Sequence, residues 1–148
     1  MTPHYRHTQT GYVLIVALGA TMVASLGMAI RLQGTHVPSL VTWLVPAIMA
    51  ISLMLTYSMT VHVDDEALRF HLSFGWFRRR YALKEIASTR IVTNHWLYGW
   101  GIRWIGTGWL YNVSGLKAVE MTLKNGKKVR IGTDEPDRLE AAIQQALR

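Results

Sequence analysis

The sequence of 148 residues contains no cysteine, and its first sixty residues contain almost no charge. The absence of cysteine excludes a disulfide framework, a thiolate metal site and a cysteine nucleophile. From Met1 to Thr60 the only charged side chains are Arg6 and Arg31, and no acid occurs there. Because globular proteins average roughly 25% charged residues, we predict that lipid and not water surrounds this part of the chain.

Two uncharged runs are long enough to cross a bilayer. The first extends from Tyr12 to Ile30 and the second from Val37 to Val61. A helix needs about 20 residues to cross the hydrocarbon core. The sequence therefore predicts a two-helix transmembrane hairpin over residues 1–59, with helices at about 11–31 and 37–59.

The basic residues indicate how this hairpin is oriented. His4, Arg6 and His7 precede the first run, only Arg31 lies between the runs, and fourteen Lys or Arg follow the second run. By the positive-inside rule, both termini then face the cytoplasm, as expected of a multi-pass protein of the inner cell membrane. A cleavable signal peptide is the alternative for the first run, but the second run would still anchor the protein.

Small residues recur at helical spacing in both runs. They are Ala17, Ala20, Ala24 and Gly27 in the first run, and Ala47, Ala50 and Ser58 in the second. Small side chains allow close backbone approach, which is the main source of helix attraction in lipid. We interpret the two stripes as the contact between the two helices, because a short connection forces them to be neighbours. A homodimer contact is the alternative.

Beyond the second run the hydrophobic periodicity changes from helical to twofold. The segment Leu68–Phe74 alternates apolar and polar residues, which predicts a strand with one face in water. The dipeptide Asn125-Gly126 supplies the positive φ values of a hairpin turn between two further strands. An apolar stripe over Leu139–Leu147 predicts an amphipathic C-terminal helix. Residues 60–148 are therefore predicted to form about seven short strands followed by one helix.

Two stretches of this second part carry a family resemblance. VDDEALRFHLSFGWFRRRYALKEIAS resembles the start of a bacterial pleckstrin-homology-like (PH-like) domain that follows a pair of membrane helices. GIRWIGTGWLYNVSGLKAVEMTLKNGKKVRIGTDEP is similar to a segment of small bacterial membrane proteins of that kind. The resemblance covers residues 60–148 and implies a cytoplasmic PH-like β-barrel or sandwich of two curved antiparallel sheets, capped by the helix. The expected class is thus an α+β membrane protein. PH-like domains bind phosphoinositides, proteins or no known ligand, so the resemblance implies no particular ligand.

The charge of the second part is polarised. Between Arg69 and Arg130 there are twelve Lys or Arg and only two acids. The densest cluster is Arg78-Arg79-Arg80, although strand alternation places Arg79 on the face opposite its neighbours. Anionic lipids attract basic side chains by about 1 kcal/mol each near the membrane surface, so a tethered basic domain is expected to lie against the cytoplasmic leaflet. A solvated strand face is the alternative for this cluster.

Six aromatic residues gather within sixteen positions, and a loop cannot bury all of them. They are Trp96, Tyr98, Trp100, Trp104, Trp109 and Tyr111. Some are expected in the core, and others at the membrane interface or on a partner surface. The residues that we predict for ligand or membrane contact are Arg78, Arg79, Arg80, Lys84, Trp96 and Trp100.

The sequence contains no constellation that points to catalysis, a metal or a cofactor. The six histidines lack metal-ligand spacing within one element, although His62 and His71 are expected to face each other across a hairpin. Neither a nucleophile elbow, a phosphate-binding loop nor a nucleic-acid-binding motif occurs. An enzymatic function would require a pocket that collects His71, His95 or the acids. We therefore predict a non-enzymatic, membrane-anchored module that binds anionic lipid headgroups or another membrane protein. A structural subunit of a homo-oligomer or larger membrane complex is the alternative.

Overall fold

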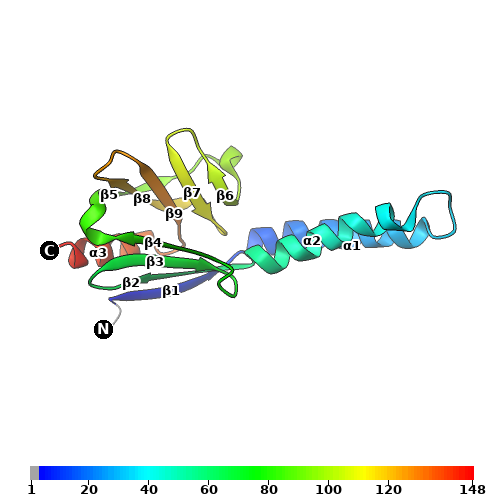
Figure 1. Ribbon diagram of the computed structural model, residues 1–148, viewed down its shortest axis with the longest axis horizontal. Coiled ribbons are helices and arrows are strands. Elements are labelled where there is room, and N and C mark those ends of the chain that lie inside the picture. The colour runs from blue at the N-terminus through cyan, green and yellow to red at the C-terminus, as the bar shows by residue number, and fades with distance from the viewer. Residues whose placement is uncertain (1–3) are drawn as a thin grey trace.

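The computed structural model describes residues 4–148 and shows a two-sheet β domain from which a helical hairpin projects (Figure 1). Helices α1 (Tyr12–Arg31) and α2 (Ser39–Thr56) pack along each other. Both are long and apolar enough to cross a membrane, and only 6% of each apolar stretch is buried. Helices that are apolar on their exposed surface are poorly solvated by water, so this hairpin is compatible with a membrane hairpin. Residues 1–3 of the predicted hairpin segment lie outside the described residues.

The residues described by the structure contain nine strands, where the sequence predicts about seven. They are β1 (Tyr5–Thr10), β2 (Ser58–Val63), β3 (Ala67–Leu72), β4 (Phe77–Ala82), β5 (Ile86–Thr93), β6 (Gly101–Trp104), β7 (Gly108–Asn112), β8 (Lys117–Leu123) and β9 (Lys128–Gly132). Two single helical turns, η1 (Leu83–Glu85) and η2 (Trp96–Tyr98), precede and follow β5, and helix α3 (Pro136–Ala146) comes last. Strand β1 was not predicted because its sequence, YRHTQT, has no apolar alternation.

The strands form two sheets of different topology. Sheet A has the order β1-β2-β3-β4 and is antiparallel throughout. Sheet B has the order β5-β8-β9-β7-β6, and its β7 and β9 run parallel. The prediction of two purely antiparallel sheets is therefore wrong for sheet B. Glycine at position 108 allows β7 and β9 to pair, because a Cβ there would overlap the carbonyl oxygen of Lys128.

The hydrophobic core lies between the two sheets. Phe70 of sheet A and Met121 and Ile131 of sheet B are at most 1% exposed. Helix α3 packs on β5 and β8 and also contacts β2, with Leu139 and Ile143 fully buried. The predicted amphipathic C-terminal helix that packs its apolar stripe on the sheet is thus confirmed.

The helical hairpin is inserted between the first two strands of sheet A. Strand β1 pairs with β2 along its whole length, with Tyr5 opposite Val63 and Thr10 opposite Ser58. Helix α2 ends at Thr56 and not at residue 59 as predicted, because β2 already begins at Ser58. The β domain therefore includes a strand from the segment that the sequence assigns to the hairpin. Since β1 and β2 are paired, both ends of the hairpin lie on one side of any membrane that it crosses.

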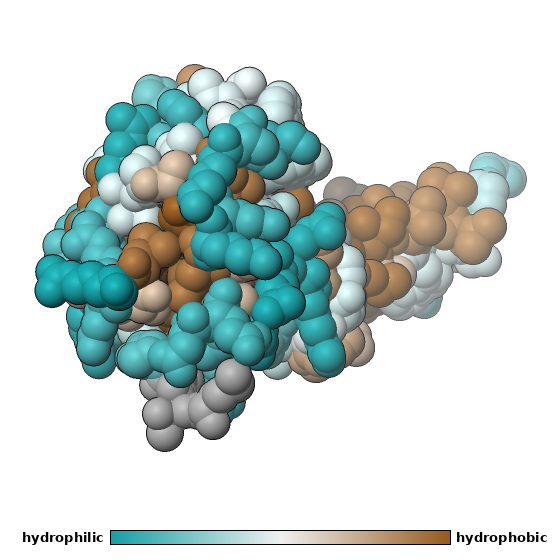
Figure 2. Space-filling model, turned by 60° about the vertical axis from the view of Figure 1, so that its left-hand side comes forward, coloured by the Kyte–Doolittle hydropathy of each residue, from teal (hydrophilic) through white to brown (hydrophobic). Residues whose placement is uncertain are grey.

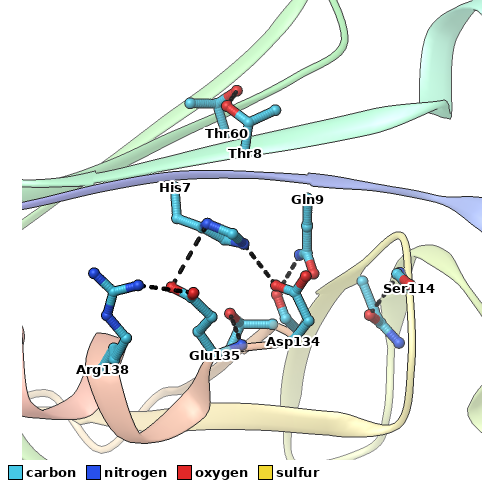
Figure 3. A network of polar contacts seen from close by, with 11 residues as sticks. His7, Thr8, Gln9, Thr60, Ser114, Asp134, Glu135 and Arg138 are labelled. Atoms are coloured by element: carbon cyan, nitrogen blue, oxygen red, sulfur yellow. Dashed lines mark hydrogen bonds and ion pairs between the residues drawn. The ribbon is translucent and has the colours of Figure 1, made fainter.

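Polar contacts fix β1 to the loop that precedes α3 (Figure 3). His7 Nε2 lies 2.7 Å from the Asp134 carboxylate, and His7 Nδ1 lies 3.6 Å from the Glu135 carboxylate. Gln9 is 2% exposed and donates from Nε2 to a backbone carbonyl at the end of β9 at 2.5 Å. The strand that enters α1 is thus joined directly to the C-terminal segment of the domain.

The contact between α1 and α2 does not use the predicted small residues. The partly or fully buried positions are Leu14, Ile15, Leu18, Gly19, Met22, Ser25 and Ala29 on α1, and Thr42, Pro46, Met49, Ser52, Leu53, Leu55 and Thr56 on α2. The small residues Ala17, Ala20, Ala24 and Gly27 on α1, and Ala47 and Ala50 on α2, are exposed. The buried positions of the two helices thus include other small residues, such as Gly19, Ser25 and Ala29, whereas the predicted ones on the helices face outward and Ser58 lies in β2.

Candidate functional site

Two rows of side chains cross the outer face of sheet A, which is turned away from the core. Successive cross-strand neighbours on β1 to β4 form the first row, which is Arg6, His62, Arg69 and Arg80. Neighbours on the same strands form the second row, which is Thr8, Thr60, His71 and Arg78. We call the six Arg and His side chains of these rows the basic face of sheet A. Because residues two apart on a strand share a face, the antiparallel register alone brings these six together.

The basic face is hollowed. A depression of about 780 Å³ is lined by its residues on β2, β3 and β4, together with Asp64, Phe70, Arg79 and the turn residues Phe74 and Gly75. Arg79 lies over the Phe77 ring, with its Cζ 5.1 Å from the ring centroid. Arg78 and Arg80 point to the outer face, as strand alternation predicts. The arginine cluster of β4 therefore contributes two side chains to the face and one to the margin of the depression.

Acids neutralise only one end of the basic face. Arg69 Nη1 lies 3.1 Å from Asp64, and Arg80 Nη2 lies 3.2 Å from Glu66. Arg78 instead donates from Nε to a backbone carbonyl of the β3–β4 turn at 2.8 Å, and it forms no ion pair with any residue from 4 to 148. The end of the face at this turn thus keeps an uncompensated positive charge.

Two histidines stack at the centre of the basic face. The ring centroids of His62 and His71 lie 6.0 Å apart with an interplanar angle of 30°, which confirms that they face each other. Burial, and then the charges of Arg6, His71 and Arg69, lower the pKa of His62. His71 Nδ1 is buried without a hydrogen-bond partner in the described chain. A bound anion would offset the repulsion that His62 experiences from its cationic neighbours.

Exposed aromatic side chains lie where the helices leave sheet A. Phe74 and Trp76, in the β3–β4 turn, are 56% and 46% exposed. Trp76 donates from Nε1 to the carbonyl oxygen of Leu55, in the last turn of α2, at 2.6 Å. The uncompensated Arg78 follows two residues later in the chain. Aromatic rings with a polar edge are favoured at the surface of a membrane, so this turn combines interfacial aromatics with positive charge.

Sheet B also presents aromatic residues near the helices. Its β7–β8 loop lies against the start of α1, because a Cβ at Gly11 would be 2.8 Å from the carbonyl oxygen of Val113. Trp100 is half-buried and donates from Nε1 to Gly115 of the same loop at 3.2 Å. Trp96 is 66% exposed in η2, close by in the chain. The predicted division of the aromatic cluster between core and surface is confirmed, since Tyr111 is buried.

The six predicted contact residues therefore lie in three places. Arg78, Arg79 and Arg80 line the depression on sheet A, whereas Trp96 and Trp100 lie in the connection between β5 and β6, Trp96 in η2 and Trp100 just before β6. Lys84 is exposed in η1, after the end of β4 that is remote from the α2 helix. The structure does not bring these residues into one cluster.

Four residues of the basic face were missed from the sequence. Arg69 and His71 alternate with the core residues of β3, and this alternation could have placed them beside the β4 arginines. His62 could have been found in the same way once its hairpin was recognised. Arg6 had no such signal, because nothing in the sequence predicts that β1 joins the sheet.

Sheet B carries a second charged cluster, whose acid is buried. Glu120 is 1% exposed and lies 2.6 Å from both Arg130 Nε and Arg90 Nη2. Burial tends to raise the pKa of Glu120, but hydrogen bonds from Arg130 and Arg90 outweigh burial and lower it. The acid is thus saturated with its own partners, and we assign this cluster a structural role.

No protein-family model, curated protein or solved structure matches this chain. The class of the protein is therefore defined by the architecture itself. It is an α+β protein in which an exposed, apolar helical hairpin interrupts the first sheet of a two-sheet domain. The outer face of that sheet is basic, and within residues 4–148 no group of three metal-ligating side chains occurs.

Proposed function

We propose that the protein is a membrane-anchored, non-enzymatic binding module whose basic face contacts anionic lipid headgroups at the cytoplasmic leaflet. The hairpin is the anchor, and it holds the β domain within reach of the leaflet. The observation that carries this proposal is the β3–β4 turn. There Trp76 is bonded to the end of α2, and Arg78 has no acidic partner among the described residues.

The interaction energies favour a weak contact between the basic face and the headgroups, which the membrane anchor makes effective. Each basic side chain near an anionic surface contributes about 1 kcal/mol. Such a contact is too weak to recruit a soluble protein, but tethering raises the effective concentration of the headgroups. The salt-bridged Arg69 and Arg80 contribute less than Arg78, because Asp64 and Glu66 already compensate them.

We also propose that the β domain of this protein is related in fold to PH-like domains. A four-stranded antiparallel sheet, a second sheet and a C-terminal helix support it. The parallel β7–β9 pair and the strand before the hairpin depart from the expected arrangement.

The experiment uses the full chain, because residues 60–148 lack β1. The protein is placed in nanodiscs of phosphatidylcholine or of phosphatidylglycerol, and hydrogen–deuterium exchange is measured over β3 and β4. We expect slower exchange of the β3–β4 turn in the anionic nanodiscs. The difference is expected to shrink as the salt concentration rises, because the Debye length falls from about 10 Å at 0.1 M to about 3 Å at 1 M.

A pair of charge variants tests whether Arg78 is responsible for the lipid-dependent protection. Arg78→Gln is expected to abolish most of the lipid-dependent protection, whereas Lys124→Gln removes the same charge at an exposed site after the far end of β8 and leaves the protection intact. Equal exchange in neutral and anionic nanodiscs, or equal effects of the two variants, would overturn the headgroup proposal.

A second candidate function is a structural subunit of a homo-oligomeric or larger membrane complex. The small residues Ala17, Ala20 and Ala24 face away from α2, which favours a further helix against this side of α1. Chemical crosslinking in native membranes tests it, and a protein found only as an isolated monomer would remove this candidate.

A further inference from the structure

A second recess opens between the two sheets, on a different surface from the basic face. It has a volume of about 570 Å³ and is walled by Tyr81 of β4 and by the end of the β6–β7 hairpin, with Leu123 and Val129 at its base. Figure 2 shows hydrophobic surface in a hollow of the β domain, bordered by hydrophilic residues. The cavity that Tyr81, Leu123 and Val129 help to line is called the intersheet recess below.

Two tryptophans line the intersheet recess and remain exposed. Trp104 and Trp109 are 60% and 45% exposed, and their rings meet edge to face with centroids 5.7 Å apart. They pair at one end of the β6–β7 hairpin, and Gly101 and Asn112 pair at the other, next to the loop that contacts the start of α1. The membrane interface therefore does not account for this tryptophan pair. Exposed apolar clusters of this kind mark interaction sites.

The tryptophan pair is rigidly mounted on the core. Trp109 stacks on Tyr111 with ring centroids 6.5 Å apart, and Tyr111 lies 4.7 Å from the buried Phe70. Burial, and then the neighbouring Tyr111 hydroxyl, raise the pKa of Tyr81, so the Tyr81 wall of the recess stays uncharged even in alkaline solution. A surface that is already ordered loses little conformational entropy when it binds, and Trp is among the residues that dominate binding energy.

The charges at the rim determine which partner fits. Lys127 and Lys128 border the intersheet recess, and none of the described residues that line it is acidic. Lys127 is exposed and forms no ion pair with residues 4–148, while Lys128 Nζ lies 3.8 Å from Glu120. An apolar floor beneath a basic rim is complementary to an apolar side chain flanked by carboxylates.

We propose that the intersheet recess binds an acidic segment of another protein. In this complex an aromatic or aliphatic side chain of the partner packs on Trp104 and Trp109, and its carboxylates pair with Lys127 and Lys128. The proposal goes beyond the headgroup contact of the basic face and does not depend on it. With both surfaces in use, the anchored domain would hold a protein partner beside the membrane.

Site-specific photocrosslinking of the full-length protein in its native membrane tests the proposal. The photoreactive residue p-benzoylphenylalanine replaces Thr107, which is exposed at the recess, and in a parallel sample it replaces Gln144, which is exposed on α3. Adducts are identified by mass spectrometry, and the crosslinked peptide of the partner is sequenced. We expect the position 107 probe alone to label a distinct protein, on a net-negative segment that contains a large apolar side chain.

Matched variants separate this result from chance capture. Lys127→Glu and Trp104→Ala, both at exposed side chains, are each expected to reduce the adduct yield about tenfold, as truncation of a hot-spot contact does. Lys127→Arg and the equally charge-reversing Lys117→Glu are expected to preserve it. Hydrogen–deuterium exchange of β7 and β9 verifies that each variant is folded.

Four outcomes would overturn the proposal. They are adducts only with lipid, adducts only with a second copy of this chain, the absence of any adduct at position 107, and a yield that Lys127→Glu leaves unchanged.

Discussion

Glu120 shows how a single buried residue makes the stability of this domain depend on pH. Its carboxylate is shielded from water and held by Arg90 and Arg130, whose hydrogen bonds lower its pKa. A carboxyl with a lower pKa in the folded than in the unfolded chain contributes stability at pH values above its unfolded pKa. That contribution is lost as the pH falls through the folded pKa.

Replacement of Glu120 tests this account at the residue scale. Glu120→Gln keeps the shape of the side chain but removes its charge, and we expect it to lower the free energy of unfolding by about 1 to 3 kcal/mol at neutral pH. Unfolding in detergent with increasing denaturant measures the loss. The difference between wild type and variant is expected to shrink on acidification below about pH 4, near the ordinary carboxyl pKa. The exposed Glu85→Gln serves as the control, and an equal loss in both variants would contradict a special role for Glu120.

His7 holds β1 to the rest of the domain through two acids. It lies between Asp134 and Glu135, and Glu135 Oε2 has no hydrogen-bond partner in residues 4–148. We expect His7→Ala to destabilise the domain by about 1 to 3 kcal/mol, because it removes the imidazole that lies 2.7 Å from Asp134 and 3.6 Å from the partly buried Glu135 carboxylate. Hydrogen–deuterium exchange should accelerate in β1 and in the β9–α3 loop. His36→Ala, in the exposed α1–α2 connection, is the control.

Among the elements, the β3–β4 turn links the β domain to the hairpin. Trp76→Phe keeps an aromatic ring but removes the hydrogen bond to the Leu55 carbonyl. We expect a loss of about 1 kcal/mol in stability, with faster exchange in the turn and at the end of α2. Trp104→Phe is the matched control, since Trp104 is also exposed. Unchanged exchange in Trp76→Phe would show that the turn does not couple the two parts.

The elements also show where the local sequence pattern was sufficient to predict the secondary structure. Both apolar helices, the Asn125-Gly126 hairpin and the C-terminal helix were predicted, because each carries its signal in consecutive residues. Strand β1 was not, since its six residues are polar and it is stabilised by pairing with β2. The parallel β7–β9 pair depends on which strands become neighbours, and no local pattern encodes that choice.

For the whole molecule, the β1–β2 pairing requires both flanks of the hairpin to share one side of the membrane. The absence of cysteine makes this easy to test with single-cysteine variants. In spheroplasts, a maleimide that cannot cross the membrane is expected to label Gln33→Cys in the α1–α2 connection. Arg6→Cys and Lys124→Cys are expected to react only after permeabilisation. If one of Arg6→Cys and Lys124→Cys were labelled before permeabilisation and the other only afterwards, the β1–β2 pairing would be contradicted. If both were labelled before permeabilisation and Gln33→Cys only afterwards, the proposed cytoplasmic orientation would be contradicted.

The sequence by itself determined that two segments are suited to lipid, because nearly sixty consecutive residues contain only two charges. It also determined the density of basic residues on β4. Only the tertiary structure decided that Arg6 joins the basic face through β1, and that Trp104 and Trp109 border a recess. The reason is physical: cross-strand neighbours are set by strand order and register, which arise from packing of the whole chain and not from any local stretch.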